Sequence, residues 1–157
     1  EFKPEHLGII STIGISMILL TLIVNMKWQI RLGIALVILF IYPFLLNITY
    51  NPEVYWQQVL MQTFIDSGDF NKYPVLPWFA LAILGSVMAT GWLKGWKTEN
   101  KKILFSFVIG VGSILVATFI RMERGFGNIF PFSDFGSYSF FLDQKYPPSL
   151  YHNLWFF

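Results

Sequence analysis

The sequence contains no cysteine, which excludes disulfides, thiol nucleophiles and thiolate metal sites. Only two histidines are present, His6 and His152, and because they stand at opposite ends of the chain we expect no histidine-based metal site. Charge is scarce as well: 13% of the residues are charged, against roughly 25% in a typical soluble domain. The net charge of +2 gives no indication of nucleic-acid binding. The composition therefore excludes a water-soluble globule and indicates an integral membrane protein.

Long apolar runs are what the sequence has in abundance. Four runs approach the roughly 20 residues that a helix needs to cross a bilayer core, and they cover residues 7–26, 30–48, 76–93 and 103–120. A fifth run, over residues 148–157, is about half that length. We predict an all-α integral membrane protein in which one transmembrane domain, residues 1–157, has four full spans and a partial fifth. The short fifth run suggests a piece of a longer protein.

Basic residues concentrate in two of the links between the runs, where the positive-inside rule places the cytoplasm. These residues are Lys27, Arg31, Lys94, Lys97, Lys101 and Lys102. The opposite ends of the runs carry more acidic residues, in the outer loops 49–75 and 122–147. We therefore predict that the N-terminus lies outside and that the basic loops lie in the cytoplasm. We expect the membrane to be a bacterial inner membrane.

Both outer loops contain apolar residues that water does not favour. Residues 54–65 mix large apolar side chains with glutamines, which predicts a short surface helix with an apolar side facing lipid or protein. The loop 122–147 is crowded with phenylalanine and tyrosine between glycines. We expect it to fold over the outer mouth of the bundle, to cover a site, or to bury against a partner. The expected partners are the bilayer and further membrane helices or subunits, and not nucleic acid.

The interiors of the four runs contain no ionisable residue, which argues against a proton or ion pathway built from this chain alone. Arg121, at the end of the fourth run, is a candidate substrate or anion contact, with an ordinary interface arginine as the alternative. Lys145 is a candidate phosphate or carboxylate contact, with a helix-entry lysine as the alternative. No residue pattern identifies a catalytic group, so the catalytic residues stay unknown.

Three motifs in collinear order resemble the membrane proteins of the heparan-α-glucosaminide N-acetyltransferase-like family. The first is Lys72-Tyr73-Pro74-Val75-Leu76-Pro77-Trp78-Phe79 with Gly85 shortly after it. The second is the turn that contains Arg121, Gly125, Gly127 and Asn128, and the third is Lys145-Tyr146-Pro147-Pro148-Ser149-Leu150. The residues that we take from the first and third as structural motif positions are Pro77, Trp78, Gly85, Tyr146, Pro147, Pro148 and Ser149.

The resemblance implies acyl transfer across a membrane. Acetyl-CoA would be used on the cytoplasmic side, and the acetyl group would pass to an amino sugar or glycan on the other side. This chain has no counterpart of the region that holds the family's proposed catalytic histidine. It would correspond to the middle of the family's bundle and supply scaffold, part of the acceptor mouth, and Arg121 and Lys145 as anion contacts. No cofactor is expected within this chain itself.

Two readings of function stay open. The chain is part of an acetyltransferase-like enzyme, or it is a non-catalytic small membrane subunit that stabilises a larger complex through helix packing and its aromatic outer loop. A transporter half is disfavoured because no midplane charge or Gly-Pro helix break is present. A gene of more than roughly 300 residues, on the order of two domain lengths, would favour the enzyme.

Overall fold

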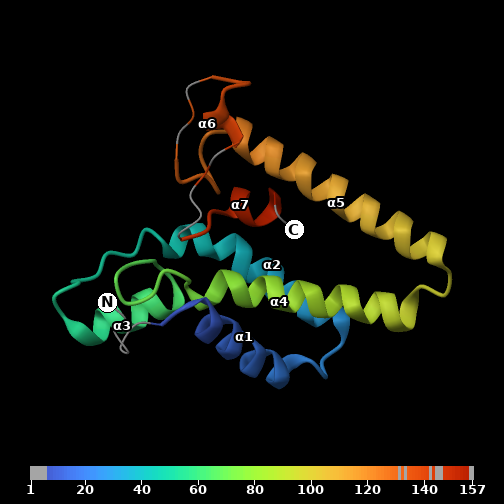
Figure 1. Ribbon diagram of the computed structural model, residues 1–157, viewed down its shortest axis with the longest axis horizontal. Coiled ribbons are helices and arrows are strands. Elements are labelled where there is room, and N and C mark those ends of the chain that lie inside the picture. The colour runs from blue at the N-terminus through green and yellow to red at the C-terminus, as the bar shows by residue number, and fades with distance from the viewer. Residues whose placement is uncertain (1–6, 131, 133, 142, 144–146, 156–157) are drawn as a thin grey trace. The chain divides into compact units, whose positions relative to one another are not determined.

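The computed structural model describes residues 7–130, 132, 134–141, 143 and 147–155, and all regular elements in this described part are helices. The chain divides into two compact units, Glu1–Leu84 and Gly85–Phe157, which we describe separately. The helices in chain order are α1 (Ile9–Ile23), α2 (Trp28–Leu45), α3 (Tyr55–Phe64), α4 (Val75–Thr90), the π-helix η1 (Gly91–Gly95), α5 (Glu99–Met122), α6 (Tyr138–Phe141) and α7 (Leu150–Trp155) (Figure 1). The predicted all-helical membrane class is confirmed.

Three helices in the described part are long and apolar enough to cross a membrane: α2, α4 continued by η1, and α5. Helix α1 is apolar but has only 15 residues, fewer than the predicted span 7–26. It begins late because Leu7 is extended and its N–H donates to the Phe70 carbonyl at 3.0 Å. The four full spans and the partial fifth therefore stay a prediction, whereas three spans are supported by length and composition.

In the first unit, α1 and α2 each bury residues along one side of the helix. Thr12 and Ser16, one turn apart on α1, are both buried. Helix α2 buries Arg31, Ala35, Leu39 and Tyr42, which follow one another at helical spacing, so Arg31 lies in this helix and not in the link before it. Small side chains allow helix backbones to approach closely, which is the usual basis of packing within a bilayer. Most of the large apolar residues of α1 and α2 stay exposed instead, as lipid-facing helices require.

The second unit is built on α5, the longest helix. Glu99 lies in its first turn and Arg121 in its last, so both charges complement the helix dipole. After α5 the chain enters a segment rich in phenylalanine that contains α6; we call residues 123–143 the aromatic loop. Helix α7 follows and packs against α5 (Figure 1). The end of α5, the aromatic loop and α7 thus form one local structure.

Candidate functional site

In the first unit, the segment that leads into α4 is held in place by polar side chains. Thr12 Oγ1 donates to the Tyr73 carbonyl at 2.6 Å, and Asn71 Nδ2 donates to the same carbonyl at 2.9 Å. The Tyr73 N–H donates in turn to Asn71 Oδ1 at 3.0 Å. Asn71 and Pro74 are fully buried, while Lys72 between them is exposed. The first motif therefore begins with a fixed turn that presents one lysine outward.

The other residues of this motif lie in α4. Pro77 is fully buried in the first turn of the helix, where a missing N–H leaves no helical hydrogen bond unmade. Trp78 is half-buried, and its ring centroid lies 6.3 Å from that of Tyr73. A Cβ at Gly85 would meet no described atom within 4 Å, so close packing does not explain the glycine. Their proposed role as structural motif positions stays a prediction.

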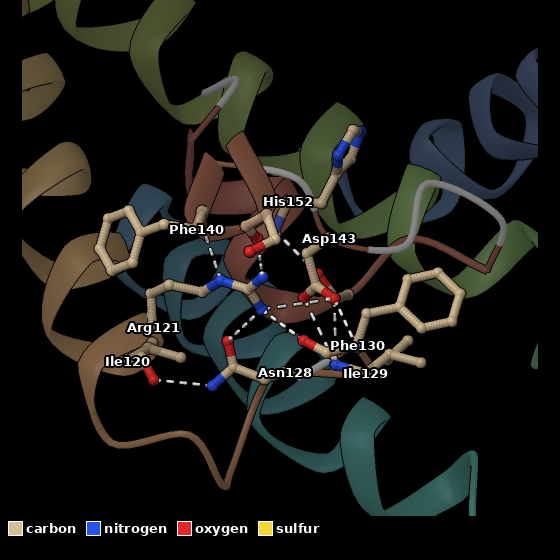
Figure 2. A network of polar contacts seen from close by, with 10 residues as sticks. Ile120, Arg121, Asn128, Ile129, Phe130, Phe140, Asp143 and His152 are labelled. Atoms are coloured by element: carbon tan, nitrogen blue, oxygen red, sulfur yellow. Dashed lines mark hydrogen bonds and ion pairs between the residues drawn. The ribbon is translucent and has the colours of Figure 1, made fainter. Parts of the chain in front are cut away.

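In the second unit, Arg121 lies at the centre of a buried polar network (Figure 2). Its side chain is 0% exposed. Its Nε donates to the Phe140 carbonyl at 2.8 Å, and its Nη2 donates to the Ser139 carbonyl at 2.7 Å. Its Nη1 donates to the Phe130 carbonyl, also at 2.7 Å. One guanidinium thus binds two separate stretches of the aromatic loop to the end of α5.

Asn128 and Asp143 complete this network, which we call the Arg121 network. Arg121 Nη1 donates to Asn128 Oδ1 at 3.1 Å, and Asn128 Nδ2 donates to the Ile120 carbonyl at 2.7 Å. Asp143 Oδ1 lies 3.6 Å from Nη1 and accepts the Phe130 N–H at 2.7 Å, and the Asp143 side chain is also fully buried. The buried positive charge therefore has its counter-ion beside it, as a buried charge requires.

The turn between Arg121 and Asn128 depends on backbone geometry that glycine favours. Gly127 has a φ of 83°, and a Cβ there would lie 2.9 Å from Ile120 Cγ2 and 3.2 Å from Leu150 Cβ. Its carbonyl accepts the Tyr151 N–H at 3.1 Å. A side chain at this position would both strain the backbone and push α5 and α7 apart. The structure brings the residues of the Arg121 motif into one turn.

The Pro-Pro-Ser motif enters the same region. Pro147, Pro148 and Ser149 are buried, and Ser149 Oγ accepts the His152 N–H at 3.0 Å, which is the hydrogen bond of a helix N-cap. The Tyr151 ring centroid lies 5.1 Å from Arg121 Cζ. Lys145 and Tyr146 lie outside the described residues. The second and third motifs, far apart in the sequence, thus meet around Arg121.

Aromatic rings cover the Arg121 network on a further side. The Phe132 centroid lies 5.1 Å from Arg121 Cζ and 4.5 Å from Arg124 Cζ, so the ring contacts two guanidinium groups. Phe132 and Phe140 also pack edge to face, with centroids 5.1 Å apart. Such cation–π contacts favour burial of the arginine. The crowding of phenylalanine in this loop therefore has a local structural reason.

Sequence reasoning missed Asp143 as a site residue. The available signal was that a buried arginine needs an anion, and that few acidic residues stand in the aromatic loop. Tyr151 Oη and Asn153 Nδ2 are also buried, and neither has a hydrogen-bond partner in the described part of the chain. Among the described residues no group of three His, Asp or Glu side chains could hold a metal ion.

One comparison with known proteins agrees with the first motif, Lys72 to Phe79 with Gly85. The family model described as heparan-alpha-glucosaminide N-acetyltransferase, catalytic, matches residues 6–116, which include α1 to α4 and most of α5. The match ends before the Arg121 network and the Pro-Pro-Ser motif. Neither the comparison with curated proteins nor that with solved structures gives a match. Since the family match covers well over half of the 157 residues, the chain belongs to the heparan-alpha-glucosaminide N-acetyltransferase catalytic family.

Proposed function

We propose that this chain is a membrane-embedded part of an enzyme that transfers an acetyl group from acetyl-CoA to the amino group of a glucosaminide-type acceptor across the bilayer. The family match over residues 6–116 is the observation that carries the proposal. In the net reaction the C–S bond of the thioester breaks, a C–N bond forms between the acetyl group and the acceptor, and the amine proton ends on the coenzyme A thiolate. The chain provides helical scaffold and one face of the acceptor mouth, and its catalytic group stays unassigned.

The proposed topology has an external N-terminus, four crossings and a partial fifth over 148–157. The distribution of charge supports it: lysines gather after α4, whereas Glu53, Asp66 and Asp69 stand between α2 and α4. Under the positive-inside rule the lysine-rich end is cytoplasmic. In this arrangement acetyl-CoA meets the lysine-rich end and the acceptor meets the opposite side. The location that we propose for the chain is a bacterial inner membrane.

The residues from η1 to the first turn of α5 fit the charge of acetyl-CoA. Lys94, Lys97 and Lys101 are exposed there, whereas Lys102 forms an ion pair with Glu99 at 2.7 Å. Trp92 and Trp96 stand beside them, with ring centroids 6.5 Å apart. Exposed ammonium groups attract the phosphates of the nucleotide, while the chemistry comes from the thioester. These three lysines would hold acetyl-CoA near the membrane surface.

On the acceptor side, Arg121 is proposed to act by positioning the aromatic loop. Its bonds to the Phe130, Ser139 and Phe140 carbonyls occupy donors that a substrate anion would need. The earlier alternative, direct contact of Arg121 with an anion, would require the loop to open. Lys145 stays proposed as an anion contact, although it lies outside the described residues. The position of the aromatic loop then determines the shape of the opening through which the acceptor enters.

The proposal can be tested with the full-length protein in vesicles that carry a glucosaminide acceptor inside and labelled acetyl-CoA outside. Acceptor-dependent acetylation of the enclosed sugar is the expected result. Replacing Lys94, Lys97 and Lys101 together with glutamine should raise KM for acetyl-CoA about tenfold, because three exposed contacts of about 0.5 kcal/mol each contribute roughly 1.4 kcal/mol together. Lys72→Gln is the matched control, since Lys72 is an exposed lysine on the other proposed side. Absence of acetyl transfer by the unaltered protein would overturn the proposal.

A non-catalytic subunit is the second candidate, and exposed aromatic residues favour it. On the aromatic loop these are Phe126, Phe130, Phe135, Tyr138 and Phe141. An apolar surface of this kind is typical of a protein or lipid contact. Intact mass in detergent separates the two candidates: a mass near 18.2 kDa with partners in fixed stoichiometry would favour a subunit. A clearly larger single chain with acetyltransferase activity would exclude it.

A further inference from the structure

Helix α3 has its apolar residues outside and polar residues inside, which is the reverse of a helix on a soluble protein. Trp56, Leu60 and Phe64 follow at steps of four and form one stripe, which we call the α3 stripe. Trp56 is 62% exposed and Leu60 is 51% exposed. Gln62, on the opposite face from Leu60, is only 5% exposed. Water does not favour this arrangement, so the outward face needs an apolar or interfacial environment.

The inward face of α3 is fixed by specific hydrogen bonds. Gln62 Oε1 accepts the Phe70 N–H at 2.8 Å, and Gln62 Nε2 donates to the Tyr50 hydroxyl at 3.2 Å. A side chain at Gly68 would collide with the same Gln62 amide. The orientation of α3 about its own axis is therefore determined by polar contacts. The α3 stripe faces outward because Gln62 is anchored inward.

The position of α3 along the membrane normal is fixed as well. The Tyr42 hydroxyl donates to the Ile65 carbonyl, immediately after α3, at 2.7 Å. Tyr42 stands three residues before the end of α2, a rise of about 4.5 Å along the helix. Figure 1 shows α3 at the end of the first unit where α2 ends and α4 begins. Helix α3 is therefore held at the depth where a membrane span emerges.

We propose that α3 lies in the interfacial layer of the bilayer, with the α3 stripe inserted among phospholipids. The exposed apolar surface of α2 continues to the same depth through Phe40, Ile41 and Phe44. Tryptophan and tyrosine prefer this layer, and α3 begins with Tyr55 and Trp56. Residues 55–64 carry no charge, so insertion depends on apolar burial and does not require anionic lipid.

Lipid contact at α3 has a consequence for the rest of the first unit. Gln62 holds the Phe70 N–H, and the Phe70 carbonyl accepts from Leu7 at 3.0 Å. Asn71 and then the first family motif, which starts at Lys72, follow directly. A helix seated in the bilayer surface therefore fixes the depth of the segment that leads into α4. This inference rests on the membrane location of the chain and not on the proposed acetyl transfer.

Because the native chain has no cysteine, single cysteines can be spin-labelled without background. We would label Leu60→Cys in the full chain, reconstituted in phosphatidylcholine nanodiscs, and compare its accessibility to molecular oxygen and to a neutral nickel chelate. Glu53→Cys is the control, because Glu53 is exposed just before α3. The label at 60 should be reached by oxygen and protected from nickel at least fivefold relative to the label at 53.

Two results would overturn the proposal. Equal nickel accessibility at positions 60 and 53 would mean that the α3 stripe faces water. Protection of position 60 from both reagents would mean that protein covers it, as a partner helix would. Phe64→Cys, one turn further on, provides a second site if Leu60→Cys does not fold, and the same pattern is expected there. Neither result depends on whether the protein transfers acetyl groups.

Discussion

Arg121 organises the aromatic loop. The sequence predicted where this loop lies in the chain but not the contacts that fold it. From the sequence Arg121 was an interface arginine or an anion contact. In the structure its guanidinium is enclosed by loop carbonyls, and its counter-ion is Asp143 of the same chain. Removing a charge from water is costly unless it is paired and hydrogen-bonded. The energetic gain of this arrangement therefore depends on all of its contacts being present together.

Arg121→Lys should destabilise the second unit even though the charge is kept. A lysine has one ammonium and cannot donate to the adjacent Ser139 and Phe140 carbonyls and to Phe130 in the fixed geometry of a guanidinium. Buried carbonyls would be left unsatisfied, and we expect a loss of about 3 kcal/mol in the free energy of unfolding. Chemical unfolding in detergent micelles would measure it.

Arg124→Lys is the matched control for this substitution. Arg124 is an exposed arginine in the same loop, and its cation–π contact with Phe132 can be kept by a lysine. Its effect should stay within about 0.5 kcal/mol, as is usual for surface substitutions. If Arg121→Lys were as stable as Arg124→Lys but lost acetyl transfer, Arg121 would be a substrate contact and not a positioning residue.

At the scale of elements, the sequence predicted the helices well and their environments less well. Runs of apolar residues are enough to locate α2, α4 and α5, because a span must be apolar along its whole length. Helix α3 was predicted over 54–65 and is found at Tyr55–Phe64. The late start of α1 was not predictable, because it depends on pairing between Leu7 and Asn71, which are distant in the sequence. The contact of α7 with α5 is non-local in the same way.

The π-helix η1 at the end of α4 allows a test of one local contact, that between Gly91 and the Trp96 ring. A Cβ at Gly91 would lie 2.6 Å from Trp96 Cζ2, and the Trp96 ring stacks on Phe105 with centroids 3.9 Å apart. Gly91→Ala should therefore displace the indole from Phe105. Fluorine NMR of fluorotryptophan-labelled protein should show a shifted Trp96 resonance, assigned with Trp96→Phe.

Gly95→Ala is the control within the same π-helix, because a Cβ at Gly95 meets no described atom within 4 Å. The two substitutions have the same cost in backbone freedom, so any difference between them reports the contact with Trp96. A Trp96 resonance that moves equally in both variants would show that η1, and not the indole contact, had changed.

At the scale of the whole molecule, the family motifs fall into two separately described units. The first motif starts α4 in the first unit, and the Arg121 and Pro-Pro-Ser motifs meet in the second. The order of these motifs along the chain could be read directly from the sequence. Their roles could not, because the buried Asn71 and Asp143 that hold them look like ordinary loop residues until the fold encloses them. Motif recognition therefore identified the family better than it identified the contacts.

The number of membrane crossings is the whole-molecule property that decides the sidedness of the proposed reaction. Helix α1 has 15 residues, but the apolar stretch around it reaches Met26, so we expect it to cross. Gly8→Cys and Met26→Cys, tested in intact cells with a membrane-impermeant maleimide, should then differ: position 8 should be labelled from outside and position 26 only after lysis. Glu53→Cys and Asn100→Cys are exposed reference sites for the two sides. If positions 8 and 26 share the behaviour of Asn100→Cys, α1 does not cross, and the N-terminus lies on the acetyl-CoA side.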